Sequence, residues 1–292
     1  MILMVLFVFV SILRDTPSKR KQFNRLKIPG MATFILGKYS AETGNFTNTT
    51  PVAEMQILDG GREFWFTELG YVDGGSRLLQ IGCVSNTGGG YTQLSVMRHI
   101  TWDPVLKLLL SNPVKEQEEL RGAKLFSQGQ TSVTRPPNGT EAIARLFEVL
   151  PATQTPTLDL NVTLTIPATP AGATSPPLFG VSVLDPPNIT YVGKDQGAAI
   201  SFRVDATRNV SMTLTFHGFT NYGKVFPLAP GQTEIDLRIL VDNTVVESFA
   251  SGGRGVVTST GRGKGTAIHA FSVGSDLQVV GAEGYAVECG WS

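Results

Sequence analysis

The sequence contains little cysteine, little histidine and little charge, and each shortage excludes a class of protein. Cys83 and Cys289 are too few for a disulfide scaffold, and we treat both as small buried thiols. His99, His217 and His269 share no metal-ligand spacing, so no metal or cofactor is expected, and these histidines are assigned to the surface or to packing. Charged residues make up 16%, with 24 basic against 24 acidic side chains. No net field therefore favours nucleic acid or an anionic membrane surface.

A long hydrophobic segment is also missing. The most apolar stretch, residues 1–13, is shorter than the ~20 residues of a membrane span, and no basic residue precedes it. It is therefore neither a firm membrane span nor a convincing signal peptide. Residues 5–12 fit a buried strand equally well, and we favour this interpretation, which would make Met1 an internal start or an artefact of the gene model.

Glycine, proline and alternating apolar residues are what the sequence does have. With 32 glycines, 17 prolines and 41% hydrophobic residues, the chain is typical of many short strands that close a substantial core. Apolar and polar residues alternate with period two in residues 158–164, 200–204, 212–216 and 235–241. This pattern predicts an antiparallel sandwich of two packed sheets. Residues 141–150 show helical spacing instead, so helix and strand both stay open there.

A short helix is predicted after Ser111. Asn112 is suited to cap it and Pro113 to begin it, and acidic residues in its first turns would favour its positive end. These acidic residues are Glu116, Glu118 and Glu119.

Six of the eleven asparagines lie in Asn-x-Ser/Thr triplets, although a Thr-rich chain also makes some by accident. Such triplets are acceptors of N-glycosylation in secreted proteins. They predict an extracellular, secretory-pathway or vacuolar protein. The six are Asn45, Asn48, Asn138, Asn161, Asn188 and Asn209.

Residues 239–254, with the sequence ILVDNTVVESFASGGR, resemble the C-terminal sandwich of glycoside hydrolase family 32, which contains invertases, levanases, inulinases and fructosyltransferases. Residues 32–47 resemble a hairpin of that family, and residues 113–121 resemble its segment between propeller and sandwich. The resemblance implies an all-β chain with three parts. Residues 1–112 would be about two blades of a five-bladed propeller, residues 113–122 a linker helix, and residues 123–292 the sandwich.

The resemblance also implies a substrate, either sucrose or a fructan-type carbohydrate. The family's catalytic carboxylates lie in Asn-Asp-Pro, Arg-Asp-Pro and Glu-Cys-Pro motifs, and this sequence contains none of them. We therefore expect no catalytic residue here. Residues 59–67 resemble a motif beside the acid/base glutamate, so Asp59, Arg62 and Trp65 are the candidate remnants of a substrate site. Trp65 and Phe66 depart from the family pattern, which puts the shape of that site in doubt.

Two other features have a structural explanation beside a functional one. Asp242 and Glu247 lie five residues apart, on opposite faces of a continuous strand, so a shared site would need a turn between them. Trp65, Trp102 and Trp291 suit stacking on sugar rings, but burial is the commoner fate of tryptophan. Two functions remain open: a truncated β-fructosidase, or a non-catalytic protein that binds carbohydrate or regulates a partner.

Overall fold

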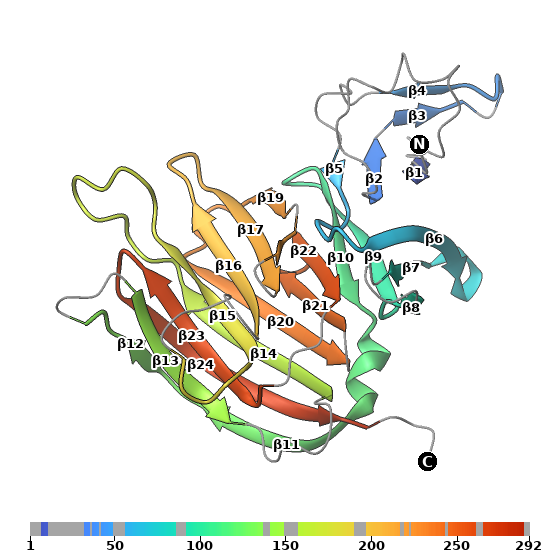
Figure 1. Ribbon diagram of the computed structural model, residues 1–292. Helices are drawn as coiled ribbons and strands as arrows, with labels where there is room; N and C mark the ends of the chain where they lie inside the picture. The colour runs from blue at the N-terminus through green and yellow to red at the C-terminus, as the bar shows by residue number, and fades with distance from the viewer. Residues whose placement is uncertain are drawn as a thin grey trace.

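The structure is a computed structural model, and it describes residues 7–10, 32–35, 37–40, 42–48, 56–85, 92–136, 141–148, 157–189, 197–216, 219–221, 223–242, 245–260 and 265–288. Nearly all of these residues lie in antiparallel strands, which confirms the all-β prediction. Two large sheets form the C-terminal part, and smaller sheets lie at the N-terminal end (Figure 1). No helix among the described residues is long and apolar enough to cross a membrane.

The first sandwich sheet has the strand order β11-β24-β14-β20-β21-β22, with β12 paired to β24. Its central strand β14 aligns Leu158 with Val241 of β20 and with Ala286 of β24. The strands are β11 (Arg121–Gln128), β12 (Thr131–Val133), β14 (Thr157–Thr165), β20 (Glu234–Asp242), β21 (Val245–Ala250), β22 (Gly255–Thr260) and β24 (Leu277–Val287).

The second sandwich sheet has the order β13-β23-β15-β16-β17-β18, with β19 paired to β17. Alternate side chains of both sheets point inward and form one buried core. Its residues lie between Val133 and Ala282 in the sequence. All four strands predicted from period-two alternation are present, as β14, β16, β17 and β20. The strands of this sheet are β13 (Glu141–Glu148), β15 (Leu178–Asp185), β16 (Ala198–Val204), β17 (Asn209–Phe216), β18 (Phe219–Thr220), β19 (Lys224–Pro227) and β23 (Ala267–Val273).

The open segment 141–150 is a strand where it is described. β13 pairs with β23, but the register shifts between Arg145 and Phe147. Such a bulge adds one residue and moves the following side chains to the other face. The adjacent residues Leu146 and Phe147 therefore both pack against the core that Ala142 enters, and apolar residues four and five positions apart imitate the spacing of a helix.

The N-terminal part contains a three-stranded sheet, β1-β2-β5, a five-stranded sheet, β10-β9-β7-β6 with β8 on β7, and the two-stranded hairpin β3-β4. The hairpin expected from the resemblance of residues 32–47 is present, and Gly44 in its connection has a φ of 68°. Whether these sheets are propeller blades stays a prediction. The strands are β1 (Phe7–Val10), β2 (Ala32–Ile35), β3 (Gly37–Tyr39), β4 (Phe46–Asn48), β5 (Gln56–Ile57), β6 (Phe64–Val72), β7 (Arg77–Ser85), β8 (Thr92–Leu94), β9 (Arg98–Asp103) and β10 (Leu108–Pro113).

Two short 3-10 helices complete the described elements, η2 (Asp73–Gly75) and η3 (Lys115–Leu120). The helix η3 lies inside the predicted linker, but the predicted start is wrong. Asn112 and Pro113 end strand β10, and the helix has no side-chain cap. The amide of Asn112 donates instead to the carbonyl of Gly252 at 2.9 Å, so this side chain ties the end of β10 to the sandwich. The bounds of the strands and helices do not test the predicted domain boundaries.

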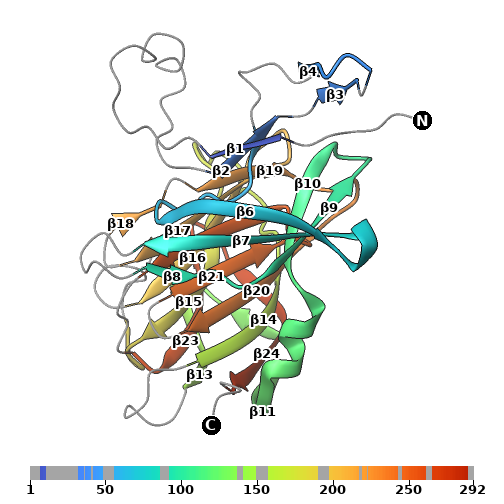
Figure 2. The same cartoon turned by 90° about the vertical axis from the view of Figure 1, so that its right-hand side faces the viewer.

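The two parts meet at the outer face of the first sandwich sheet, where the five-stranded sheet crosses β21 and β22 (Figure 2). Backbone bonds join them directly: the Gly60 N–H donates to the Val256 carbonyl, and the Ser111 N–H donates to the Gly253 carbonyl. A smaller apolar cluster of N-terminal side chains, including Phe34, Phe64 and Ile100, also takes in Val245 of the sandwich. We call this contact region the joint.

All residues of the large hydrophobic core belong to the sandwich. We therefore predict that residues 123–292 remain folded when the N-terminal part is cut. Limited proteolysis of the full chain should nick the N-terminal third first and leave a resistant C-terminal fragment, identified by mass spectrometry. Preferential loss of the C-terminal part would contradict this prediction.

Candidate functional site

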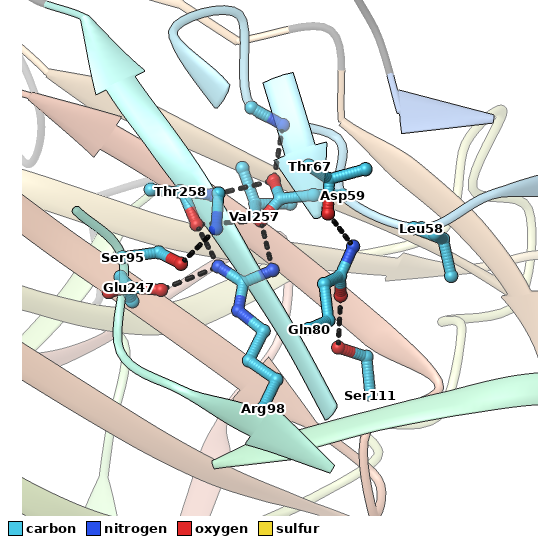
Figure 3. Close-up of polar contacts among 12 residues, drawn as sticks. Leu58, Asp59, Thr67, Gln80, Ser95, Arg98, Ser111, Glu247, Val257 and Thr258 are labelled. Atoms are coloured by element: carbon cyan, nitrogen blue, oxygen red, sulfur yellow. Dashed lines mark hydrogen bonds and ion pairs between the residues drawn. The ribbon is translucent and has the colours of Figure 1, made fainter. Parts of the chain in front are cut away.

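The candidate site is a set of buried charged and hydroxyl side chains at the joint (Figure 3). Asp59 follows β5, Arg98 begins β9, Lys224 begins β19, Glu247 lies in β21 and Thr258 in β22. The first two come from the N-terminal part and the other three from the sandwich. Charged side chains are almost never fully buried unless they are paired, so each of these charges requires a partner.

Arg98 is the centre of the set and is 0% exposed. Its Nη1 donates to Asp59 Oδ2 at 2.8 Å, and its Nη2 donates to Glu247 Oε2 and, at 2.8 Å, to Thr258 Oγ1. Burial lowers the pKa of Arg98, but Glu247 and Asp59 outweigh that effect, so the pKa is raised and the guanidinium stays charged. The guanidinium carbon also lies 4.4 Å from the ring centre of Phe64.

Asp59 uses both carboxylate oxygens inside the protein. Oδ1 accepts from the backbone N–H groups of Gly61, at 2.7 Å, and Thr258, at 3.0 Å. Oδ2 accepts from Arg98 and, at 2.6 Å, from the hydroxyl of Thr258. In this arrangement the backbones of Gly61 and Thr258 approach so closely that only glycine fits, because a Cβ on Gly61 would lie 2.1 Å from the carbonyl oxygen of Thr258.

Glu247 and Lys224 complete the set. Glu247 accepts the Val96 N–H at 2.7 Å besides its bond from Arg98, and burial raises the pKa of this glutamate. Lys224 donates to the carbonyl of Leu58 at 3.3 Å. Burial, and to a lesser extent the repulsion of Arg98, lower the pKa of Lys224 to about 8. The attraction of Asp59 opposes this shift.

The three residues predicted as a remnant substrate site differ in where the structure places them. Asp59 is fully buried in the joint, whereas the side chain of Arg62 is exposed and its backbone N–H donates to Asn221 Oδ1 at 2.8 Å. Trp65 lies in β6, and its side chain is outside the described part. A carbohydrate-binding role for these three residues stays a prediction, and the described contacts of Asp59 are all within the protein.

The other sequence candidates fall in several places. Glu247 lies in the joint, and Asp242 ends β20, the antiparallel neighbour of β21, but Glu247 is held by Arg98. Trp102 packs against the N-terminal cluster. His269 is buried, and His99 and the free Cys83 are half-buried. The residues outside the described part are Trp291, Cys289 and His217. Among the described residues, no group of His, Cys, Asp or Glu is arranged to hold a metal ion.

The glycosylation candidates differ in exposure, and their modification stays a prediction. Asn45 and Asn188 are exposed in loops, while Asn161 and Asn209 are half-buried on strands. The side chain of Asn48 and all of Asn138 lie outside the described residues.

Arg98 and Lys224 were missed by sequence reasoning. Arg98 has the same strand parity as the buried Ile100, which is a weak signal for an inward-facing charge. Lys224 likewise shares a face with the buried Phe226. No sequence pattern indicates that the partners of Arg98 lie 39 and 149 residues away.

Comparison with known proteins places these features in a family. The family model described as "Glycosyl hydrolases family 32 C terminal" matches residues 116–285. No curated protein sequence matches the chain. Among solved structures, fructan 1-exohydrolase IIa from Cichorium intybus has a TM-score of 0.71 at 18% identity, over 89% of this chain and 55% of that one.

Two further solved structures have the same fold. Exo-inulinase from Aspergillus awamori gives a TM-score of 0.64 at 14% identity, over 89% of this chain and 50% of that one. Sucrose-6-phosphate hydrolase from Lactobacillus gasseri gives 0.60 at 14% identity, over 88% and 48%. The chain therefore spans about half the length of the solved structures that it matches.

We predict that Arg98→Met destabilises the protein strongly. The substitution leaves two buried carboxylates without their cation, and breaking a buried pair in this way costs about 3–5 kcal/mol. Urea unfolding measures the loss, with Arg77→Met as a matched control, because Arg77 makes an exposed ion pair with Glu116 and should contribute little. Equal losses in the two variants would contradict this account of the joint.

We also predict that Lys224→Met stabilises the protein, and that the gain depends on pH. The folded chain binds this proton less tightly than the unfolded chain, so the folded state is penalised fully below pH 8. Wild-type stability recovers as pH rises from about 8 towards the unfolded pKa of 10.5. The gain from the substitution should reach at most about 3 kcal/mol at pH 7 and fade above pH 9. Urea midpoints between pH 6 and 10 test it, and a gain that grows with pH would reverse the sign argued here.

Proposed function

The chain belongs to glycosyl hydrolase family 32, and from this premise we propose that it is the non-catalytic part of a β-fructofuranosidase-like protein whose substrate is sucrose or a fructan. The observation that carries the proposal is the joint, because it fixes an N-terminal sheet on the outer face of the sandwich through a buried guanidinium, backbone bonds and an apolar cluster. Such a contact makes the sandwich a rigid support for the N-terminal sheet.

The joint itself is not suited to hydrolysis. A retaining glycosidase needs two carboxyl groups about 5 Å apart that reach the scissile bond, one ionised and the other protonated. Asp59 and Glu247 are 0% and 3% exposed, and Arg98 lies between them as partner of both. A sugar could reach neither carboxylate without breaking the joint.

A non-catalytic carbohydrate-binding role is the second candidate, and one observation favours it. A cleft of about 480 Å³ opens between the linker and the outer face of the first sandwich sheet. Hydroxyl, amide and charged groups on its walls suit a polyhydroxylated ligand, and Phe249 also lines it. The polar side chains from the sheet are Asn161, Thr163, Asp236 and Arg238.

We place the protein outside the cell or in the secretory pathway or vacuole. The support for this proposal is the set of glycosylation triplets, two of whose asparagines, Asn45 and Asn188, are exposed in loops. Peptide mass mapping of the natural protein before and after enzymatic glycan removal tests the location, since occupied triplets require passage through the secretory pathway.

We predict that the chain, expressed as written, releases no fructose from sucrose, inulin or levan above background, because the nucleophile and the general acid are missing. Fructose is measured by chromatography after long incubation. Steady release that a single carboxylate substitution abolishes would overturn the proposal. Binding of these sugars by a chain that does not cleave them, weakened by Asp236→Asn, would favour the second candidate over the first.

A further inference from the structure

One glycosylation triplet lies on the floor of the cleft of about 480 Å³ between the linker and the first sandwich sheet. We call this cleft the linker cleft. Asn161 and Thr163, the two residues that define the triplet, both line it, whereas Val162 between them belongs to the sandwich core. The triplet therefore presents its acceptor amide and its hydroxyl to one cleft, whose volume is in the range of small-ligand sites.

The strand register shows what surrounds the acceptor amide. Asn161 of β14 lies directly between Glu283 of β24 and Arg238 of β20. Arg238 lies opposite Phe249 of β21, so these four residues form one row across the first sheet. The linker reaches this row through Glu118 of η3, whose Oε1 accepts from Nη1 of Arg238 at 3.4 Å. A group attached to Asn161 would thus lie between this row and the linker.

The amide of Asn161 is free to carry such a group. Its one described hydrogen bond runs to Glu283 Oε1 at 3.4 Å, which is long for an N–H donor. An asparagine amide has two N–H groups, and glycosylation replaces one of them. The remaining N–H can keep the bond to Glu283 while the nitrogen carries a sugar.

The order of the strands gives a period in which Asn161 is accessible. In the folded chain β14 is paired on both sides, by β20 and β24, so a transferase could not reach its backbone (Figure 1). Both partners come later in the sequence, β20 beginning at Glu234 and β24 at Leu277. At about 5–20 residues per second, several seconds pass after the synthesis of Asn161 before β20 follows. The triplet can therefore be modified before the first sheet closes over it.

We propose that Asn161 carries an N-linked glycan whose first sugars occupy the linker cleft. The amide nitrogen displaces pyrophosphate from a lipid-linked oligosaccharide: the nitrogen–carbon bond to the first sugar forms, the carbon–oxygen bond to phosphate breaks, and the nitrogen loses one proton. The assignment rests on the secretory location and the carbohydrate-binding cleft proposed above. It adds a regulation of that cleft, because a glycan held there excludes free sucrose or fructan.

Glycopeptide mass spectrometry of the full chain, secreted from a eukaryotic host, measures the occupancy of Asn161. We expect the site to be occupied, and we expect Asn161→Gln and Thr163→Val each to lower the mass of the protein by one glycan. Thr163→Val keeps the asparagine in place, so the result does not depend on the folding of a single variant. Asn188→Gln is the matched control, because Asn188 is exposed in a loop.

Digestion of the folded protein with peptide N-glycosidase tests where the glycan lies. The walls of the linker cleft should cover the bond between Asn161 and the first sugar. We therefore expect this glycan to be released at least tenfold more slowly than a glycan at Asn188 or Asn45. Unfolding in urea should abolish the difference, because all of these bonds are then open to the enzyme.

Titration calorimetry with an inulin oligosaccharide tests the regulation. We expect Asn161→Gln to bind it at least tenfold more tightly than the glycosylated wild type, and Asn188→Gln to behave as the wild type. A protected glycan at Asn161 without any sugar binding by Asn161→Gln would support the glycan and contradict the carbohydrate-binding candidate. The two failures are therefore distinguishable.

Two results would overturn the proposal. One is an unmodified Asn161 in a chain whose Asn45 or Asn188 is modified. The other is a glycan at Asn161 that the glycosidase removes from the folded protein as fast as the glycan of Asn188. A chain without a glycan at any of its triplets would overturn the secretory location together with this assignment.

Discussion

One buried guanidinium bonds to both parts of this chain and, together with backbone bonds and a small apolar cluster, fixes how they fit together. Arg98 is completely buried, and moving such a charge out of water costs several kcal/mol even after the protein relaxes. Its compensation comes from both sides: Asp59 belongs to the N-terminal part, and Glu247 and Thr258 belong to the sandwich. Neither part alone can satisfy all of these groups. In the placement observed, the two Nη groups of Arg98 bond to both parts, while its buried Nε has no hydrogen-bond partner among the described residues.

Buried ion pairs often add little net stability compared with apolar side chains of similar volume, so specificity of placement is the better explanation of this one. The backbone supports that view. A Cβ on Gly60 would lie 2.3 Å from the Gly223 carbonyl oxygen, so the chain after β5 runs directly against the segment before β19. At such distances the Thr258 N–H can reach Asp59, and a shift of about 1 Å would break several bonds together.

The sequence predicted what depends on local periodicity. Strands β14, β16, β17 and β20 follow from alternation, because a half-buried sheet requires it. The segment of β13 imitated a helix because a bulge changed its phase, and bulges depend on the neighbouring strand. Asn112 was expected to cap a helix, but a carbonyl 140 residues away offered its amide another partner. The joint could not be predicted for the same reason. The side-chain bonds of Arg98 are all long-range, and no local sequence pattern encodes them.

The same burial acts in opposite directions on the two buried cations of the joint. For Arg98 the low dielectric strengthens the attraction of two carboxylates, and the net effect holds the charge in place. For Lys224 there is no carboxylate within hydrogen-bonding distance among its described partners, so desolvation dominates. A joint selected for stability alone would favour an apolar residue at this position.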